Sequence, residues 1–552
     1  MASRTIWSMN SAVISGQPPR PWVAPTSIFV AALLLYSINL NRPPHPDELH
    51  HVLAAQHLWE TGRPSIGDGE YVRGILHTWM VALSYKAFGE SLASARLPAV
   101  VFVALVAPLL FVWVRREAGN LAAWLTAVLF LTSPFAVEIA QFSRFYALQI
   151  FSFTAGAMCA YYALATGNTG WRSALLAAAA AGMFALAVWL QVTTFMGLIA
   201  IAIWITGVLV WKFAVFSSSD AASRNRKFVA ALIIAAILAI VAIVVLSKWQ
   251  WAVERYRYAP MFAAETVDEF WYYHVRFLLL YPTLWTLVGV LAIAAVLRNA
   301  GLAWLAIVVF GVSFLLASFA GQKEMRYFCF AQPFIAMLWG LGLAQVAPEL
   351  AAWLRSSRQR LQLGFSGGVL TFLVLVSVVV MNPFWLRTAT VIGNVALPGE
   401  KSATDWRAAR DVLTPWIAKA EIVITTEELG AIYFLGRSDV RYSPNKIREI
   451  RDDRRHEFGI DPRLGLPIIS EPGSVEKLMT CFNSGIVVGP AEHWGNPILI
   501  GEPEQAIIRA HARPIEVPRK SHLYAWGWSR QAVERPAYCA GLERFSGLPA
   551  AP

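Results

Sequence analysis

Apolar runs of membrane-spanning length recur along the first two thirds of this chain of 552 residues. A helix rises about 1.5 Å per residue, so about 20 apolar residues cross a hydrocarbon core of about 30 Å. Only 15% of the residues are charged, against about 25% in soluble proteins. The sequence therefore predicts a polytopic α-helical membrane protein with eleven spans, at 22–40, 96–114, 119–135, 145–166, 172–190, 194–212, 228–247, 276–297, 302–319, 327–347 and 365–381.

The distribution of basic residues predicts which loops face the cytoplasm. With eleven spans, the loops on the N-terminal side hold eleven basic residues and only three acidic ones, which is the excess that cytoplasmic loops carry. The segment 73–90 is apolar enough to be a twelfth span, but that count would export the basic pair Arg115 and Arg116. We therefore expect 73–90 to lie on the membrane surface as an amphipathic helix. The N-terminal tail 1–21 is then cytoplasmic, and the loop 41–95 faces outward.

The chain changes character after residue 383, where no membrane-length apolar run remains. The strand-like segments 421–426 ("EIVITT") and 486–490 ("IVVGP") alternate with helix-like segments. This alternation predicts a small α/β domain with a largely parallel sheet. We expect residues 22–383 to form the membrane domain and 384–552 an extracytoplasmic α/β domain. The chain has no GxGxxG or P-loop motif. Basic cytoplasmic loops explain its net charge of +11, so the charge does not require a nucleic-acid partner.

The first outer loop opens on the motif HPDELHH, which places Asp47 and Glu48 within ten residues of the first span. Acids near a membrane surface are often solvated loop charges, but three other outer segments also gather polar side chains. A carboxylate can take a proton from a hydroxyl, and Lys and Arg bind phosphate. The combination predicts transfer of a group from a phosphate-bearing donor. The candidate substrate-binding residues are Arg73, His77, Glu138, Arg144, Tyr146, Lys323, Arg326 and Tyr327.

Several short motifs in this order resemble the membrane-embedded C-type (GT-C) glycosyltransferases. HPDE follows the first span and is followed by Ala54, Leu58 and Gly62, and the surface segment ends in "FGES...ARLP". "SP" opens the second acidic loop, and "K..RY" comes late in the membrane domain. The chain is most similar to the bacterial branch that includes the aminoarabinose transferases, the protein O-mannosyltransferase-like enzymes and the rhizobial lipopolysaccharide-core sugar transferases. The resemblance covers residues 22 to about 347.

The resemblance implies a hexosyl- or pentosyltransferase at the outer face of a bacterial inner membrane. The donor would be a polyprenyl-phosphate-linked sugar, and the acceptor a glycolipid, polysaccharide or protein of the envelope. By position, Asp47 would be the general base and Glu48 would orient or bind beside it. Lys323 and Arg326 would grip the donor phosphate in place of a metal. Glu138 would assist the acceptor, although many bacterial members have an Asp further along, where this chain has Tyr146 or Gln149.

Simpler interpretations of the same residues remain open. His45, His50 and His51 with Asp47 would make a divalent metal site, but helical geometry turns His50 and His51 about 100° apart, so we favour no metal. HPD also suits a helix start, with Pro early and acids in the first turn. Arg73 would equally anchor the surface helix to lipid headgroups. Tyr146 and Tyr327 are also typical of interfacial aromatic residues.

Two other classes of function compete with the glycosyltransferase. A transporter or flippase tends to show internal repeats and helices broken at the membrane midplane, whereas the charges of this chain gather at one face. A scaffold that recruits an envelope partner would not need so many spans. Cys481 and Cys539 would form a disulfide if the C-terminal region is exported, but their spacing alone does not bring them together.

Overall fold

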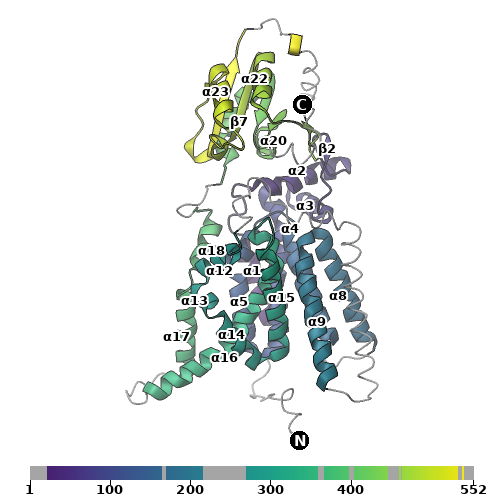
Figure 1. Cartoon of the computed structure of the whole chain (residues 1–552), viewed down its shortest axis with the longest axis vertical. Coiled ribbons are helices and arrows are strands. Elements are labelled where there is room, and N and C mark those ends of the chain that lie inside the picture. The colour runs from purple at the N-terminus through teal and green to yellow at the C-terminus, as the bar shows by residue number, and fades with distance from the viewer. Residues whose placement is uncertain are drawn as a thin grey trace.

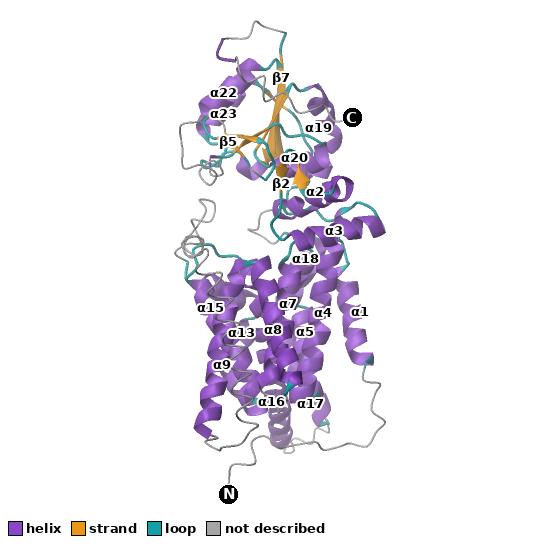
Figure 2. Ribbon diagram, turned by 90° about the vertical axis from the view of Figure 1, so that its right-hand side faces the viewer, coloured by secondary structure: helices purple, strands orange, loops and turns teal. Residues whose placement is uncertain are grey.

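The computed structural model describes residues 22–164, 170–215, 269–358, 366–396, 403–444, 459–461, 463–531 and 537–539. A bundle of long helices carries an α/β domain at one end, and two shorter helices lie between them (Figure 1). The bundle is apolar and the far domain contains the long sheet (Figure 2). The protein is therefore a multi-pass membrane protein with a C-terminal α/β domain, as the sequence predicts.

Five described helical runs are long and apolar enough to cross a membrane. They are α4 (Leu92–Ala118), α7 (Tyr146–Leu164), α8 (Trp171–Leu190), α15 (Ala300–Ser318) and the run of η3 (Met325–Ala331) with α16 (Gln332–Arg358). Two bent pairs of helices raise this number to seven if each pair is one span. These pairs are α5 (Asn120–Leu131) with α6 (Pro134–Ala140), and α17 (Gly367–Val380) with α18 (Phe384–Gly393). Helices α1 (Val23–Tyr36) and α9 (Phe195–Val215) correspond to two further predicted spans, 22–40 and 194–212.

The prediction of one continuous span at 276–297 is wrong. The structure divides this segment into α12 (Tyr272–Leu280), α13 (Pro282–Thr286) and α14 (Val288–Arg298). Proline has no N–H to donate and disfavours a helical residue before it, and Tyr281 accordingly leaves the helical region with φ −132°. The predicted span 119–135 is bent by 58° just before Pro134 for the same reason. The predicted span 228–247 lies outside the described residues.

Glycines let the central helix α16 approach its neighbours closely. A Cβ atom on Gly340 would overlap Thr126 of α5, and one on Gly342 would overlap the backbone of Leu291 in α14. Small residues at such positions allow close packing between helices in a lipid environment, where apolar burial between helices gives little drive for association. These contacts bring α5, α14 and α16 close together beneath the polar end of the bundle.

The loop after α1 forms helix α2 (Pro46–Thr61), a short hairpin of β1 (Ser65–Ile66) and β2 (Gly69–Glu70), and helix α3 (Ile75–Phe88). Figure 2 shows α2 and α3 lying across the end of the bundle rather than along it. Helix α3 covers most of the predicted surface segment 73–90 and exposes three large apolar side chains, Trp79, Leu83 and Phe88. Such an apolar face is what an interfacial helix inserts into lipid.

The α/β domain contains a seven-stranded sheet with the order β5-β6-β4-β3-β7-β9-β8. Strands β6, β4, β3 and β7 are parallel neighbours, whereas β5, β9 and β8 pair antiparallel at the two edges. The strands are β3 (Ile422–Thr425), β4 (Val440–Tyr442), β5 (Gly459–Ile460), β6 (Pro467–Ile469), β7 (Ser484–Pro490), β8 (Arg513–Pro514) and β9 (Leu523–Ser529). The expected largely parallel sheet is thus present at its centre.

Helices cover both faces of this sheet (Figure 2). On one face lie α19 (Trp406–Lys419) and α20 (Glu428–Leu435), and on the other α22 (Pro472–Cys481) and α23 (Glu502–His511). The last turn of α22 carries Cys481, which forms a disulfide with Cys539 across a Cα–Cα distance of 5.5 Å. The pairing that the sequence left open is therefore made in the structure.

The α/β domain shares one hydrophobic core with the first outer loop. Buried residues of α2 and α3, such as Leu53 and Val81, belong to the same cluster as Trp406, Val423 and Leu429 of the α/β domain. The β1–β2 hairpin also meets the domain directly, because a Cβ atom on Gly69 would overlap the backbone of residues 463 and 464. Helix α2 is therefore held between the bundle and the sheet.

Candidate active site

The motif HPDE builds the first turn of α2. The imidazole Nδ1 of His45 accepts a hydrogen bond from the backbone N–H of Asp47 (3.1 Å), and the backbone N–H of His45 donates to Glu48 Oε1 (2.8 Å). This reciprocal arrangement is a capping box, with Pro46 at a position whose N–H needs no partner. The helix-start interpretation is therefore correct, and it fixes the direction of both acidic side chains.

Glu48 is buried in an ion pair with Arg96. The guanidinium donates from Nη2 to Glu48 Oε1 (2.6 Å) and from Nε to Oε2 (3.0 Å), and both side chains are 1% exposed. Oε2 also accepts from the backbone N–H of Ser143 (3.0 Å). Burial favours the neutral acid, but Arg96 and the hydrogen bonds to Ser143 and His45 outweigh it and lower the pKa of Glu48. Glu48 is thus an ionised carboxylate whose oxygens hold α2, α4 and the 141–145 turn together.

Asp47 points the other way and keeps 37% of its side chain exposed. Its Oδ2 lies 3.1 Å from Nη1 of Arg326, and Arg144 Nη1 donates to its backbone carbonyl (2.5 Å). Burial of the carboxyl opposes ionisation, yet Arg144 and Arg326 outweigh it and lower the pKa of Asp47 well below its usual value. The carboxylate is therefore ionised at neutral pH and lies beside two guanidinium groups.

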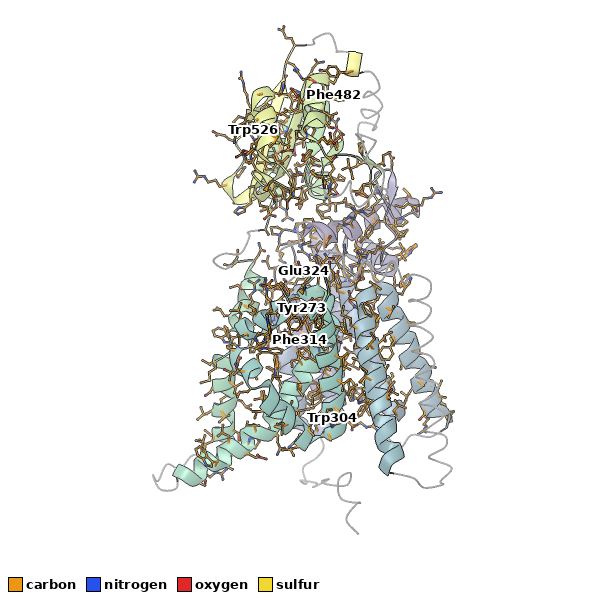
Figure 3. All side chains as sticks on the ribbon, viewed as in Figure 1. Tyr273, Trp304, Phe314, Glu324, Phe482 and Trp526 are labelled. Carbon is orange, nitrogen blue, oxygen red and sulfur yellow. A yellow bond between two sulfur atoms is a disulfide. The ribbon has the colours of Figure 1, made fainter. Side chains whose placement is uncertain are left out.

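A cavity of about 750 Å³ lies between the polar end of the bundle and the α/β domain. Figure 3 places Glu324 at this end of the bundle, above Tyr273 and Phe314, while Trp304 lies near the opposite end. On the side of the bundle the cavity is lined by Arg42, His45, Glu138, Phe142, Glu324 and Arg326. On the side of the α/β domain it is lined by Thr426, Glu427, Arg441, Glu492 and His493.

No protein-family profile and no curated protein sequence matches the chain. Solved structures do match. ArnT from Cupriavidus metallidurans in the apo state superposes with a TM-score of 0.58 at 14% identity, covering 92% of this chain and 99% of ArnT. ArnT bound to undecaprenyl phosphate gives 0.55 at 15% identity over the same shares. The chain has the GT-C fold. The fold that the sequence motifs predict is therefore confirmed.

A third similar structure is the archaeal oligosaccharyltransferase AglB from Archaeoglobus fulgidus, in complex with an inhibitory peptide and a dolichol-phosphate. It superposes with a TM-score of 0.53 at 13% identity and covers 85% of this chain and 70% of AglB. At such low identity these structures establish the arrangement of the elements. The chemistry of this chain has to be argued from its own residues.

Within this GT-C fold, the structure brings several predicted site residues together. Asp47 and Arg326 form an ion pair, and Arg144 binds the backbone beside them. Glu138 lines the cavity and lies 3.7 Å from Arg387 of α18. Tyr327 follows Arg326 directly, and its ring lies within cation–π distance of that guanidinium (5.4 Å). The loops predicted from the sequence therefore converge at one end of the bundle.

Of the predicted site residues, Glu48, Glu138 and Arg326 line the cavity, and the others, including Asp47, lie outside its lining. Lys323 is 2% exposed, and its Nζ donates to the carbonyl of Ala320 (2.7 Å). Arg73 is exposed and donates to Gln191 Oε1 (3.0 Å). His77 is buried beside Ser143, and Tyr146 is buried with its ring stacked on Phe142. These four side chains support the loops around the cavity in this structure.

The histidines near HPDE do not form a metal cluster. Burial lowers the pKa of His50 to about 3, so its ring is neutral, and it stacks on Tyr71. His51 bonds Thr78 instead (2.9 Å). In the part of the chain that the structure describes, no three His, Cys, Asp or Glu side chains are grouped to hold a metal ion. The two carboxylates of HPDE also fit a cation poorly, because Asp47 faces Arg326 and Glu48 faces Arg96.

Sequence reasoning missed the residues that the fold alone brings to the site. Arg96 is one, although a buried arginine at the start of an apolar run is a recognisable signal. Arg42 is another, and its position just after the first predicted span is also a recognisable signal. Glu427 and His493 gave no signal, because each follows a different strand of the α/β domain and only the sheet places both at the cavity.

Glu427 has an unusual environment for a carboxyl group. Its Oε1 accepts a hydrogen bond from the indole N–H of Trp406 (3.0 Å), and Glu428, Arg441 and Glu492 are the charged groups around it. Burial is the largest effect and raises the pKa of Glu427 to about 7. The side chain therefore exchanges its proton near neutral pH while it faces the cavity.

This raised pKa predicts a pH-dependent stability. The folded state holds the proton more tightly than the unfolded chain does, so the stabilisation is full below the ordinary pKa of 4.5 and is lost as the pH rises through about 7. We expect the unfolding temperature of the purified protein to fall across this window, and to fall less in Glu427→Gln. Differential scanning fluorimetry from acid to neutral pH measures both. Identical slopes for wild type and variant would show that Glu427 does not carry the effect.

Proposed function

We propose that this chain is a glycosyltransferase that moves a sugar from a polyprenyl-phosphate carrier to a hydroxyl group of an envelope acceptor. The observation that carries the proposal is the ion pair of Asp47 with Arg326, whose side chain lines a large cavity on the polar end of the bundle. The GT-C fold supports it, since ArnT is an aminoarabinose transferase found with undecaprenyl phosphate and AglB was found with a dolichol-phosphate. The donor assay described below distinguishes a hexosyl from a pentosyl donor.

In the proposed reaction Asp47 accepts the proton of the acceptor hydroxyl, and the oxygen attacks the anomeric carbon of the donor sugar. The bond from that carbon to the phosphate oxygen breaks, and its electron pair leaves with the polyprenyl phosphate. Arg326, with Arg42 on the same wall, stabilises the negative charge of the leaving group. The reaction needs no oxidant and no nucleotide, and we propose that guanidinium groups carry the phosphate without a metal.

The ion pair gives the donor a second role. Without donor, Arg144 and Arg326 lower the pKa of Asp47 and so make its carboxylate a weak base. A donor phosphate bound to Arg326 competes with Asp47 for the same guanidinium. The loss of that partner raises the pKa of Asp47, so the base becomes stronger when the donor is in place. Proton removal is thereby coupled to the presence of the sugar.

We also propose that the cavity opens to the outer face of a bacterial inner membrane, with the N-terminus in the cytoplasm. The disulfide between Cys481 and Cys539 supports an oxidising compartment for the α/β domain. The basic loops at the other end of the membrane domain support the same orientation. The position of the cavity at one end of the bundle favours chemistry at the membrane surface over transport through it.

The direct test is release of polyprenyl phosphate by the purified chain in lipid, with a panel of polyprenyl-phosphate sugars. We expect release from one donor. In Arg326→Gln we expect the KM for that donor to rise by about ten- to a hundredfold, since a hydrogen bond to a charged group contributes about 1.5–3 kcal/mol. Arg63→Gln, at an exposed position of the same outer loop, serves as the control.

Two outcomes would count against this assignment. A folded wild-type protein that releases polyprenyl phosphate from no donor, with or without extracts of envelope glycans as acceptor, would contradict the glycosyltransferase. A donor KM that is unchanged in Arg326→Gln would leave the enzyme class intact but remove Arg326 as the phosphate ligand.

A further inference from the structure

The α/β domain presents the carboxyl ends of its central parallel strands to the cavity. Thr426 and Glu427 directly follow β3, Arg441 lies in β4, and Glu492 and His493 follow β7. All five line the cavity opposite Arg42 and Arg326. This carboxyl-end edge of the sheet forms most of the described domain wall, and Ala403 and Thr404 before α19 also line the cavity.

That edge contains the topological switch point of the sheet. From β3 the chain passes through α20 to β4 on one side, whereas β6 leads through α22 to β7 on the other side of β3. Because α20 and α22 lie on opposite faces of the sheet, a crevice forms between the ends of β3 and β7. Ligands of open α/β sheets bind in such crevices, outside the carboxyl ends of the strands.

The polar groups in the crevice are connected. Thr426 Oγ1 lies 2.9 Å from His493 Nδ1 and 3.2 Å from the hydroxyl of Tyr524, which joins the ends of β3, β7 and β9. The indole N–H of Trp406 fixes the Glu427 carboxyl from the other side (3.0 Å). Trp406 is itself held against Gly430, where any Cβ atom would overlap the indole ring. The crevice is thus a preorganised set of hydrogen-bonding side chains.

The two walls of the cavity differ in the guanidinium groups they offer. The bundle wall has Arg42 and Arg326, which suit a phosphate, beside the carboxyl groups of Glu138 and Glu324. Among the described residues of the domain wall, Arg441 is paired with Glu428 at 2.6 Å, and the further charged side chains Glu427 and Glu492 are acidic. Such a wall disfavours an anionic ligand, but carboxyl, imidazole and hydroxyl groups together bind neutral hydroxyls well. Glu427 exchanges its proton near pH 7 and can accept or donate a hydrogen bond there.

We propose that the crevice between β3 and β7 binds the acceptor, and that the acceptor segment bound there is a neutral, hydroxyl-rich glycan. Glu427, His493 and Glu492 hold its hydroxyl groups on the domain wall, opposite the donor phosphate on the bundle wall. The α/β domain is then the acceptor half of the active site. This inference rests on the proposed function, since it assigns the second substrate of that reaction.

Acceptor binding can be measured apart from donor chemistry. The full-length protein in lipid nanodiscs is titrated with linear gluco-, manno- and galacto-oligosaccharides, and binding is followed by saturation-transfer NMR without any donor. We expect at least one of these neutral oligosaccharides to bind, and its Kd to rise by about ten- to a hundredfold in Glu427→Gln. Glu502→Gln, at an exposed position in the first turn of α23, is the matched control and should bind like wild type.

A second readout uses the transfer reaction. Glu427→Gln and Glu492→Gln should raise the acceptor KM by a larger factor than the donor KM. No binding of any neutral oligosaccharide to wild type, or an unchanged Kd in both variants, would overturn the proposal. Loss of donor hydrolysis in a folded Glu427→Gln variant would also overturn it, because Glu427 would then act on the donor. Glycan binding by a protein that releases no polyprenyl phosphate would contradict the proposed reaction alone.

Discussion

Replacement of Asp47 by Asn is expected to lower the rate of sugar transfer by about 10²–10⁴-fold, which is the usual contribution of a general base. The amide keeps the shape of the side chain but cannot accept a proton at neutral pH. Donor binding should persist, because Arg326 loses a competing partner and remains available to the phosphate. The measurement is kcat for transfer together with the donor KM, in the same lipid preparation.

The fold should tolerate this change. The Asp47 carboxylate is 37% exposed, and an ion pair of that kind contributes only about 0–1 kcal/mol to stability. Asp68→Asn is the matched control, since Asp68 is exposed at the tip of the β1–β2 hairpin in the same outer loop and should retain wild-type activity. An Asp47→Asn protein that transfers sugar at more than about a tenth of the wild-type rate would remove Asp47 as the base.

Replacement of Arg96 by Met is expected to have the largest effect on stability, a loss of about 3–5 kcal/mol. It leaves the Glu48 carboxylate buried without its counter-charge, and it also removes the donors to the carbonyls of Leu40 (2.6 Å) and Arg42 (3.0 Å). The end of α1, the start of α2 and the start of α4 would lose the guanidinium group that contacts all three. Denaturant unfolding in mild detergent, followed by tryptophan fluorescence, measures the change.

A double replacement separates charge burial from general damage. Arg96→Met combined with Glu48→Gln removes the uncompensated charge and should recover part of the lost free energy, so the two effects are not additive. Arg63→Met, at an exposed position, should stay within about 0.5 kcal/mol of wild type. An Arg96→Met protein as stable as this control would mean that the pair does not hold the site together.

Much of the architecture could be predicted from local patterns. Apolar length predicts helices, alternating strands and helices predict the α/β domain, and HPDE predicts a capped helix start with Asp47 and Glu48 in its first turn. Prolines explain where the prediction failed, since Pro282 divides one expected span into shorter helices. In each case the deciding signal lies within a few residues of the element that it controls.

The details of the site depend on contacts between distant segments, and these were harder to predict. Lys323 and Arg326 look like one basic pair, but the extended backbone at Glu324 separates them, so that Arg326 reaches the cavity and Lys323 bonds the chain behind it. Asp47 and Glu48 look equivalent, yet consecutive helical positions point about 100° apart and only Glu48 meets Arg96. Glu427 became a site residue only through the topology of the sheet.

The core that α2 and α3 share with the α/β domain has a consequence for how the protein matures. These two helices leave the ribosome early, whereas the sheet that covers them is encoded near the other end of the sequence. Domains generally fold in the order of synthesis, but here α2 and α3 complete their packing only after the C-terminal sheet has been synthesised. A prematurely terminated chain would insert its helices and still lack the domain wall of the cavity. Completion of translation itself is then the step that encloses the cavity between the bundle and the α/β domain.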